Sequence, residues 1–531
     1  MSRKLDALVV GAGFGGLHML HRLKQLGLDV KAVEAGDSVG GTWFWNRYPG
    51  ARCDFESHDY SYSFDSDLQN EWVWSERYPS QPEILRYLNH VADRFDLRSS
   101  IQLQTRVTAA RYDEELAQWS VTTEGNETFI ARYLIMATGA LSLPQIPAFP
   151  GIDTFSGSWY HTANWPTSKV DFTGKRVAVV GTGSSGVQVV SQIAPDAEHL
   201  FVMQRTAAFV VPAHNRPLDA ERDALVKASY DGFRQRALDS FLGLHFDTEL
   251  NPAVDTPEPE RTAAYERRWE IGGAALLAAF PDLLTNTDSN DTLATFLRAK
   301  IEEIVDDPAT AKTLTPQGFP VGAKRLIVDS EYYSTFNRSN VDVVDISTSP
   351  IRRITETGIE TADGHYEVDV IVFATGFDAL TGPLLNIDIT GKSQTQLKDR
   401  WAAGPTTYLG LSVSDFPNMF VVAGPGSPSV LSNVVRCTEL NVEWIAQFIE
   451  HMSDNGITAA EASPEAENQW VHHVNELSTA TIFPTANSWY LGANIPGKPR
   501  VFMPYAGGIP AYRQTCSDVA SSGYTGFQLT H

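Results

Sequence analysis

Two short segments of the chain carry glycine at the spacing G-x-G-x-x-G, residues 11–16 and residues 181–186. Each follows a nearly continuous apolar run, typical of a buried parallel strand, and precedes a helical pattern. Glycine there lets backbone N–H groups approach a pyrophosphate, and the start of the following helix adds partial positive charge. The spacing predicts two dinucleotide-binding loops, and a tight turn without a ligand is the alternative for the first. The residues expected to contact the nucleotides are Gly11, Gly13 and Gly16 in the first loop and Gly183 and Gly186 in the second.

The residue that ends the next strand differs between the two units. In the first unit this residue is Glu34, whose carboxylate can accept hydrogen bonds from the ribose hydroxyls of an unphosphorylated adenosine. In the second unit Arg205 takes the corresponding place, where it can bind a 2′-phosphate that a carboxylate would repel. This contrast predicts FAD in the first unit and NADP(H) in the second. The alternative is that Arg205 is a surface arginine at a strand end.

A glycine- and aromatic-rich stretch, G-G-T-W-F-W-N-R-Y-P-G-A-R-C-D, occupies residues 40–54. Its glycines suit close backbone approach to a cofactor, and its aromatic side chains could shield a flavin ring from water. A tryptophan-rich core loop is the alternative. Asp54 ends the stretch and, if buried, needs a cationic or hydrogen-bonding partner.

The three cysteines, Cys53, Cys437 and Cys516, lie far apart and form no C-x-x-C motif. Neither a disulfide framework nor a dithiol redox centre is therefore expected. Two dinucleotide sites without a dithiol predict hydride transfer from NADPH to a flavin. Dioxygen is the simplest acceptor of the electrons, because no second redox centre is visible, and no metal site is expected.

Just before the second glycine loop, the chain follows the pattern F-x-G-x-x-x-H-x-x-x-W-P, formed by Phe155, Gly157, His161, Trp165 and Pro166. This pattern resembles the fingerprint motif of type I Baeyer–Villiger monooxygenases, flavoenzymes that use NADPH and O2 to turn ketones into esters or lactones. Residues 40–54 are similar to that family's flavin-binding stretch, and its motifs run from Gly11 to Lys498. The resemblance implies that the fingerprint lies on an interdomain linker. His161 would then act in a hinge between domains that reorient, and not as a catalytic base.

The resemblance also implies the catalytic residues. Arg325 would stabilise a C4a-peroxyflavin and the tetrahedral intermediate, and Asp54 would pair with this arginine and orient it. Attack on a ketone requires the unprotonated peroxide, and arginine suits this role because it does not readily donate its proton. Trp489 would lie in a mobile lid at about residues 485–513 and contact the nicotinamide ribose and the substrate. An exposed strand-start arginine and a packed loop tryptophan are the alternatives for Arg325 and Trp489.

Other positions follow from the resemblance motif by motif. Those for FAD are Glu34, Thr42, Trp43, Phe44, Trp45, Asp54 and Tyr60, with Val107 and Val434 matching more weakly. Those for NADP are Arg52, Cys53, Asp54, Gly183, Ser184, Ser185, Gly186, Val187, Gln188, Val189, Arg205, Thr206, Lys324, Arg325 and Trp489. Those for the substrate pocket are Ser429, Val430, Leu431, Val434 and Trp489.

The overall composition limits the class of protein. The 531 residues include 64 acidic and 41 basic side chains, which gives a net charge of −23. This balance favours solubility and argues against nucleic acid or an anionic membrane as a partner. No signal peptide is evident, and no run of about eighteen apolar residues occurs. We expect a cytoplasmic protein that is a monomer or a weak homo-oligomer and whose partners are a small ketone and O2.

These motifs require an α/β fold with two Rossmann-like dinucleotide-binding domains and a helical insertion. Similar strands that end in A-T-G, at 134–139 and 371–376, suggest two related units with crossing connections. The charged residues of the insertion are most simply solvated helix faces. The expected division is FAD domain 1–143, NADP domain 144–214, helical insertion 215–322, NADP domain again 323–376, and FAD domain again 377–531.

Other functions remain open at this point. An N- or S-hydroxylating flavin monooxygenase shares both loops, but its fingerprint lacks the final W-P that Trp165 and Pro166 supply. A flavoprotein disulfide reductase conflicts with the absent C-x-x-C. A flavin-binding redox sensor would not need Arg325, Asp54 and an aromatic lid, and an NADPH oxidase that makes peroxide is distinguishable only by assay.

Overall fold

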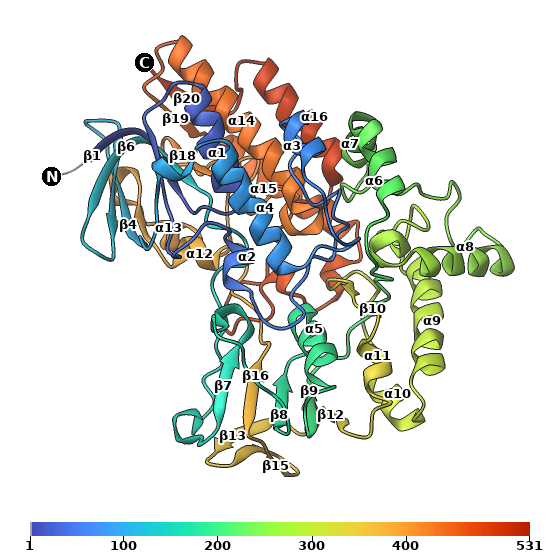
Figure 1. Cartoon of the computed structure of the whole chain (residues 1–531). Coiled ribbons are helices and arrows are strands. Elements are labelled where there is room, and N and C mark those ends of the chain that lie inside the picture. Colours follow the sequence, from blue (N-terminus) through green and yellow to red (C-terminus); the bar gives the residue numbers. More distant parts are fainter. Residues whose placement is uncertain (1–2) are drawn as a thin grey trace.

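Two sheets built largely from parallel strands form the centres of two units in the computed structural model, which describes residues 3–531 (Figure 1). The predicted α/β class with two nucleotide-binding units is confirmed. The larger unit lies in the upper part of Figure 1 and the smaller unit, with β7, β16, β8, β9 and β12, lies below it.

The sheet of the larger unit has the strand order β17-β4-β5-β6-β1-β2-β3, and β18 also pairs with β6. Its strands are β1 (Arg3–Val10), β2 (Val30–Val33), β3 (Ile101–Gln102), β4 (Val107–Asp113), β5 (Gln118–Thr123), β6 (Thr128–Met136), β17 (Asp388–Thr390) and β18 (Met419–Val421). Because β17 and β18 come late in the chain, the sheet combines an N-terminal and a C-terminal part. The apolar side chains of β1 are buried on both faces, which explains why its sequence does not alternate.

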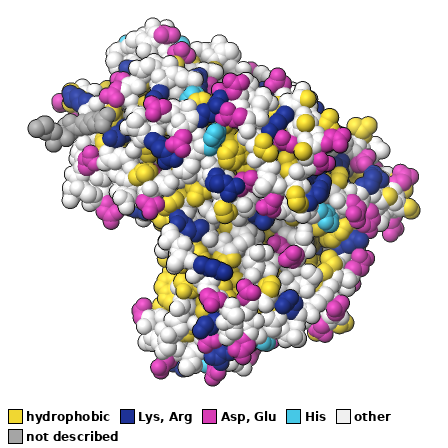
Figure 2. Space-filling model, viewed as in Figure 1, with side chains coloured by type: hydrophobic (Ala, Val, Ile, Leu, Met, Phe, Trp, Pro, Cys, Tyr) yellow, Lys and Arg dark blue, Asp and Glu magenta, His cyan; other side chains and the backbone are white. Residues whose placement is uncertain are grey.

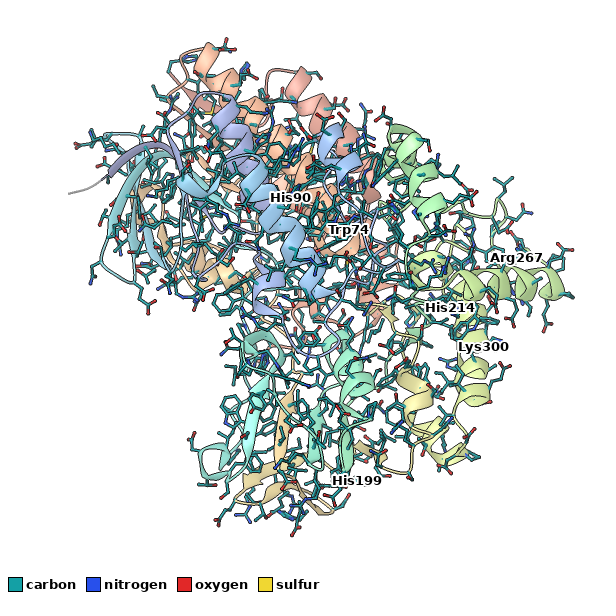
Figure 3. The ribbon with its side chains drawn as sticks, in the orientation of Figure 1. Trp74, His90, His199, His214, Arg267 and Lys300 are labelled. Carbon is teal, nitrogen blue, oxygen red and sulfur yellow. The ribbon has the colours of Figure 1, made fainter. Side chains whose placement is uncertain are left out.

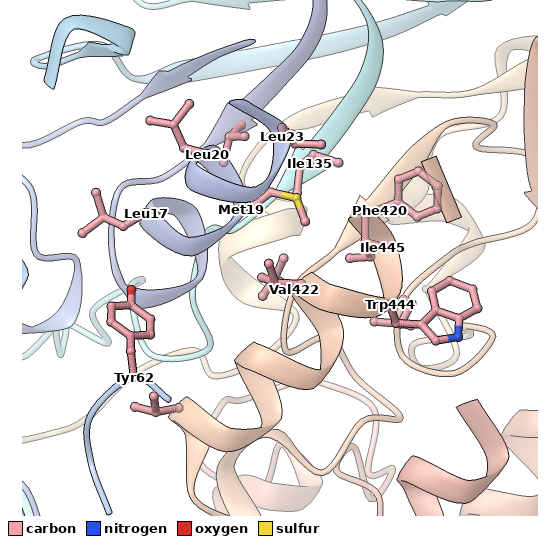
Figure 4. Close-up of a cluster of buried hydrophobic side chains, with 14 of the residues drawn as sticks. Leu17, Met19, Leu20, Leu23, Tyr62, Ile135, Phe420, Val422, Trp444 and Ile445 are labelled. Atoms are coloured by element: carbon pink, nitrogen blue, oxygen red, sulfur yellow. The ribbon is translucent and has the colours of Figure 1, made fainter. Parts of the chain in front are cut away.

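Helix α1 (Phe14–Gln25) packs against α14 (Val434–Asp454) on one face of this sheet. Figure 4 shows the core between them, where leucines of α1 share a cluster with side chains of β6, β18 and α14. The labelled members are Leu17, Met19, Leu20, Leu23, Tyr62, Ile135, Phe420, Val422, Trp444 and Ile445. This core holds the first glycine loop, which directly precedes α1.

The smaller unit has a five-stranded, all-parallel sheet of order β12-β9-β8-β16-β7. Its strands are β7 (Ser158–His161), β8 (Arg176–Val180), β9 (His199–Gln204), β12 (Val341–Asp345) and β16 (Val370–Phe373), and α5 (Ser184–Ile193) follows β8. The fingerprint motif therefore supplies an edge strand of this sheet. The register places Val180 beside Phe373, as Val10 lies beside Met136 in the larger unit, so each glycine loop lies beside an A-T-G segment.

Residues 323–376 are expected to belong to the NADP domain, but their first strand is not part of the five-stranded sheet. Strand β11 (Ile327–Val328) instead pairs with β10 (Val210–Val211) in a separate two-stranded ribbon. The N–H groups of Ile327 and Asp329 donate to the carbonyls of Phe209 and Val211, so the ribbon satisfies these backbone groups itself.

Between β10 and β11 the chain forms α6 (Ala220–Ala228), α7 (Tyr230–Asp239), α8 (Glu258–Ile271), α9 (Thr287–Ile304) and α10 (Pro308–Leu314). This segment has a core of its own that includes Tyr265, Leu276 and Leu293. Arg267 on α8 and Lys300 on α9 are on this segment (Figure 3), and Lys300 Nζ lies 2.9 Å from Glu266 Oε1 across the two helices. The charged side chains of the insertion are therefore not all solvated, because some of them form contacts between its helices.

The remaining elements are short or peripheral. The α-helices are α2 (Thr42–Trp45), α3 (Ser66–Glu71), α4 (Gln81–Arg94), α11 (Tyr332–Thr335), α12 (Gly382–Leu385), α13 (Leu397–Arg400), α15 (Pro464–Thr479) and α16 (Gly508–Ser521). The strands are β13 (Ile351–Thr355), β14 (Gly358–Thr361), β15 (His365–Glu367), β19 (Ala459–Ala462) and β20 (Phe527–Thr530), and 3-10 turns include η6 (Ser429–Leu431) and η8 (Trp489–Leu491).

The surface is indented between the two units, and Lys and Arg side chains lie along this indentation (Figure 2). Within residues 3–531, no helix is long and apolar enough to cross a membrane.

Candidate active site

Two positions of the first glycine loop, Gly11 and Gly16, leave no room for a side chain. Gly11 has a φ of +106°, and a Cβ atom there would lie 2.4 Å from the carbonyl oxygen of Ala137. A Cβ at Gly16 would lie 1.9 Å from the carbonyl oxygen of Gly11. The strand, loop and helix therefore pack as closely as a dinucleotide-binding unit requires.

Glu34 lies beside this loop and is buried, with 5% of its surface exposed. Its carboxylate accepts hydrogen bonds from the backbone N–H groups of Ala12 and Gly36, both at 2.8 Å. Each oxygen keeps a lone pair, and within residues 3–531 no cation pairs with Glu34. The residue therefore fits the ribose hydroxyls of FAD.

Some of the predicted flavin-contact residues lie near this loop, where Tyr60 packs against Phe14 with ring centres 5.2 Å apart. Thr42, Trp43, Phe44 and Trp45 form α2, and a Cβ on the preceding Gly41 would lie 2.9 Å from the Cα of Gly13. Trp43 Nε1 donates to the hydroxyl of Tyr60 at 3.1 Å. Val107 is buried at the start of β4, and Val434 is half-buried at the start of α14.

The second glycine loop is closely packed at Gly186 and open at Gly183. A Cβ at Gly186 would lie 2.1 Å from the carbonyl oxygen of Gly181, whereas a Cβ at Gly183 would meet nothing within 4 Å. Ser184 and Ser185 are half-exposed in the first turn of α5, where their N–H groups could bind phosphate. Val187 and Val189 instead belong to the core of this unit.

Two cations lie near this loop without a carboxylate partner among the described residues. Arg205 is exposed, as is Thr206, and Lys324 is half-buried with its ammonium 4.5 Å from the ring centre of Phe319. Desolvation by burial lowers the pKa of Lys324, and the nearby charge of Arg205 lowers it further. Such a cation pair gains most from a dianion between its members, which fits the 2′-phosphate of NADP.

The side chain of Gln188, on α5, forms hydrogen bonds with the segment that follows α2. Its side chain is buried, accepts from the hydroxyl of Tyr48 at 2.9 Å and donates to the carbonyl of Arg52 at 3.2 Å. Arg52 itself pairs with Glu76 at 3.1 Å. Gln188 thus contacts the loop before Asp54, while the side chain of Arg52 contacts Glu76 and the carbonyl of Tyr78. Cys53 is buried in the same loop, which raises the pKa of its thiol.

Arg325 and Asp54 form a two-pronged ion pair. The guanidinium donates through Nε to Asp54 Oδ2 at 2.9 Å and through Nη2 to Asp54 Oδ1 at 2.7 Å, while Nη1 donates to the carbonyl of Val430 at 2.8 Å. The two side chains keep exposures of 24% and 20%. Desolvation by burial opposes the charge, but the charge of Asp54 and the hydrogen bonds to it raise the pKa of Arg325 above its ordinary value.

A mainly apolar cavity of about 50 Å³ lies against this ion pair. Tyr490 and Leu431 contribute to its wall, and the helical insertion contributes Leu242, Leu277 and Leu284. Phe55, Ala274, Gly322, Leu326, Val328 and Phe483 complete the lining around Asp54 and Arg325. The arrangement places a guanidinium, held in position by Asp54, against a mainly apolar wall.

Comparison with known proteins decides the family. Residues 4–241 match the model of a family described as flavin-binding monooxygenase-like. A Baeyer–Villiger monooxygenase from Pseudooceanicola batsensis is 43% identical over 524 residues, which cover 98% of this chain and 95% of that protein. The chain belongs to the Baeyer–Villiger monooxygenases. The resemblance that the fingerprint motif indicated is thereby confirmed.

Solved structures agree with this family. An oxidized steroid monooxygenase bound to NADP superposes with a TM-score of 0.95 at 50% identity, with 99% of both chains covered. OTEMO in complex with FAD and NADP superposes with a TM-score of 0.96 at 42% identity, with both chains covered in full. This Baeyer–Villiger monooxygenase is accordingly an FAD- and NADPH-dependent enzyme, as predicted.

A relative of different name also aligns over nearly the whole chain. Phenazine N-monooxygenase PhzNO1 from Lysobacter antibioticus is 40% identical, with 99% of this chain and 97% of that protein covered. The scaffold therefore also occurs in an enzyme named for oxidation at nitrogen.

The fingerprint histidine of this monooxygenase lies away from the cavity. His161 Nδ1 accepts from the N–H of Ala163 at 3.1 Å, so Nε2 carries the proton and donates to Thr375 Oγ1, also at 3.1 Å. Thr375 donates in turn to the carbonyl of Gln145 at 2.6 Å. Through Thr375, the ring thus joins the fingerprint to the second A-T-G segment and to the backbone at Gln145. Phe155 and Trp165 pack in the cores of the smaller unit, and a Cβ at Gly157 would lie 2.3 Å from the carbonyl oxygen of Asp369.

Sequence reasoning missed most of the cavity wall. Of the five expected substrate residues, only Leu431 lines the cavity. The carbonyl of Val430 accepts from Arg325, Ser429 is buried in the same turn, and Val434 is half-buried at the start of α14. Trp489 is half-buried in η8, and its neighbour Tyr490 forms the wall. The contribution of the insertion was missed, although its apolar run at 273–280 was a visible signal.

Proposed function

We propose that this monooxygenase inserts an oxygen atom into small apolar ketones to give esters or lactones, with Arg325 as the catalytic residue and Asp54 as the residue that orients it. The observation that carries the proposal is the two-pronged ion pair, with distances of 2.7 and 2.9 Å, at the wall of an apolar cavity. Relatives are named for oxidation of cyclohexanone, acetone and cyclopentanone.

The role of Arg325 follows from its charge and its fixed position. When a ketone carbonyl carbon is attacked, negative charge develops on the carbonyl oxygen, and a fixed cation in a low-dielectric site stabilises that charge. The raised pKa means that Arg325 keeps its proton and does not protonate the attacking group. Asp54 and the Val430 carbonyl prevent the guanidinium from rotating.

The remaining residues bind and orient the cofactors. Bound FAD and NADPH would supply hydride transfer and activation of dioxygen. Gly11, Gly13, Gly16 and Glu34 would hold FAD, and Gly183, Gly186, Arg205 and Lys324 would hold NADPH. The apolar wall of the cavity supports a neutral substrate, because a charged metabolite would lose its hydration there.

The proposal is tested by NADPH consumption of the FAD-loaded enzyme with and without a panel of cyclic and open-chain ketones, with products identified by mass. We expect NADPH-coupled addition of one oxygen atom to at least one ketone, and loss of this product in Arg325→Ala. Consumption of NADPH with only peroxide as the product across the panel would contradict the proposal.

Oxidation at nitrogen is the second candidate, because the phenazine N-monooxygenase aligns over nearly the whole chain. A nitrogen heteroatom attacks an electrophilic oxygen, so this reaction gains nothing from a cation that stabilises a carbonyl oxyanion. N-oxide formation from heteroaromatic amines without ketone oxidation would favour this candidate.

We also propose that the enzyme is cytoplasmic and acts as a monomer or a weak homo-oligomer. The acidic net charge of −23 supports solubility and disfavours self-association.

A further inference from the structure

The loop that follows α7, in the helical insertion, contributes to the wall of the cavity. In this wall loop, residues 240–246, Leu242 lines the cavity beside Asp54 and Arg325. Phe241 accepts a hydrogen bond through its carbonyl from the N–H of Ile509 at 3.2 Å, and Leu244 is buried in the core of the larger unit. The position of Leu242 therefore depends on contacts that the loop makes outside the insertion.

Asn433, the N-cap of α14, connects the wall loop to Asp59. Its N–H donates to the carbonyl of Leu242 at 2.9 Å, and its side-chain Nδ2 donates to the carbonyl of Asp59 at 2.7 Å. Its Oδ1 accepts from the N–H of Val435 at 3.1 Å, as expected of a helix cap. Asn433 is fully buried, so all three contacts are made without competing water.

The side chain of Asp59 contacts the wall loop directly, through His245. Its Oδ2 lies 2.7 Å from Nδ1 of His245, at the end of the wall loop, and the carboxylate is 1% exposed. Its other oxygen, Oδ1, is buried and has no hydrogen-bond partner among the described residues. His245 is thus the ion-pair partner of this carboxylate, and loss of His245 would leave a buried charge uncompensated.

The surroundings of His245 favour its charged form. Burial lowers its pKa, but the charge of Asp59, the hydrogen bond to Asp59 and the charge of Glu56 together raise it above the usual value, against a smaller opposing effect of Arg222. The ring also lies between Phe233 and Phe246, with centroid distances of 4.7 and 4.4 Å. These contacts fix the ring position as well as its charge.

We propose that Asp59 and His245 are positioning residues that hold the wall loop, and with it Leu242, against the cavity and thereby set how tightly the substrate binds. Neither residue lines the cavity, so the pair acts through the loop. The proposal deepens the proposed function and rests on it for the identity of the substrate as a ketone.

The first test compares Asp59→Asn with Asp239→Asn in the FAD-loaded enzyme. Asp239 ends α7 just before the wall loop, is 61% exposed and lies 3.7 Å from Arg513, so it is a matched carboxylate without the buried contacts. We expect Asp59→Asn to raise KM for the ketone by about tenfold, with a much smaller change in kcat, because remote misplacement of a contact residue weakens productive binding. KM for NADPH should stay unchanged, and Asp239→Asn should match the unaltered enzyme.

The second test uses His245→Asn, whose amide nitrogen can take the place of Nδ1 and donate to Asp59 without a charge. A raised pKa means that the His245–Asp59 attraction is present at low pH and lost as pH rises through that pKa. In the unaltered enzyme KM for the ketone should therefore rise with pH over this range. In His245→Asn this rise should be absent.

Hydrogen exchange of residues 240–246 and of Asn433, followed by mass spectrometry, tests positioning without turnover. Faster exchange confined to these segments in Asp59→Asn supports the proposal, and exchange equal to that of Asp239→Asn overturns it. If the unaltered enzyme oxygenates no ketone, the proposed function fails, whereas the exchange result still decides whether Asp59 positions the loop. If Asp59→Asn does not fold, an unchanged pH profile in His245→Asn overturns the proposal.

Discussion

Arg325 and Asp54 lie 271 positions apart in the chain, yet the guanidinium meets both carboxylate oxygens, at 2.7 and 2.9 Å. Asp54 belongs to the loop after α2, and Arg325 follows the helical insertion. The ion pair therefore connects the loop after α2 to the segment that follows the helical insertion, and it lies at the cavity wall.

Replacement of Asp54 tests whether orientation of the guanidinium matters. In Asp54→Asn the amide can accept only one of the two hydrogen bonds, so Arg325 is left free to rotate about its contact with Val430. We expect ester formation to fall by about 100-fold, because misplacement by about 1 Å has effects of this size. Flavin reduction by NADPH, followed by stopped-flow absorbance, should persist. Asp388→Asn, which disrupts the exposed pair with Arg111, is the control and should leave both rates unchanged.

The two cations beside the second loop predict the choice of nicotinamide cofactor. Arg205→Ala should raise KM for NADPH by about 10- to 100-fold, the equivalent of a hydrogen bond to a charged group. KM for NADH should change little, since NADH has no 2′-phosphate. Steady-state kinetics with both cofactors measures this, with the exposed Arg338→Ala as a control. An equal rise in KM for NADH and for NADPH would show that Arg205 does not bind the 2′-phosphate.

Two glycines of one loop should respond differently to the same change. Gly186→Ala places a Cβ 2.1 Å from the carbonyl oxygen of Gly181, so the helix must shift. We expect a loss of about 1–3 kcal/mol in the free energy of unfolding, as for other overpacked sites. Gly183→Ala meets no protein atom within 4 Å and should leave thermal stability unchanged. It should nevertheless raise KM for NADPH, because the added methyl group occupies the space of the nucleotide. Equal stability of the two variants would contradict this geometry.

The fingerprint histidine should contribute to acid sensitivity. Burial lowers the pKa of His161 below the ordinary 6.5, so the folded protein keeps the ring neutral. Below pH 6.5 the unfolded chain binds a proton at this residue that the folded chain does not, and stability falls as pH falls. His161→Gln keeps a donor for Thr375 but cannot titrate. Melting temperatures from pH 7.5 to 5 should therefore decline less steeply in His161→Gln, and parallel declines would refute the assignment.

Local patterns predicted a large part of the fold and of the cofactor sites. The close approaches of Gly16 to Gly11 and of Gly186 to Gly181 depend on residues near in sequence, so spacing alone reveals them. The difference between Glu34 in the first unit and Arg205 in the second, at equivalent strand ends, is likewise a local signal. The ketone chemistry and the pairing of Asp54 with Arg325 entered through resemblance to a known family.

The rest was decided only by tertiary structure. Leu242 and Leu277 belong to the helical insertion. The apolar run at 273–280 signals burial, but no local pattern indicates that the two leucines line the same cavity as Arg325. Asp59 and His245 are 186 positions apart. Their carboxylate and imidazole form an ion pair only in the folded chain, where both groups are buried and removed from water. The sequence by itself determined which nucleotides can bind, because backbone geometry and terminal charges are local. Packing between distant segments decided the shape of the cavity, because apolar burial is not directional and its partners are set by the whole fold.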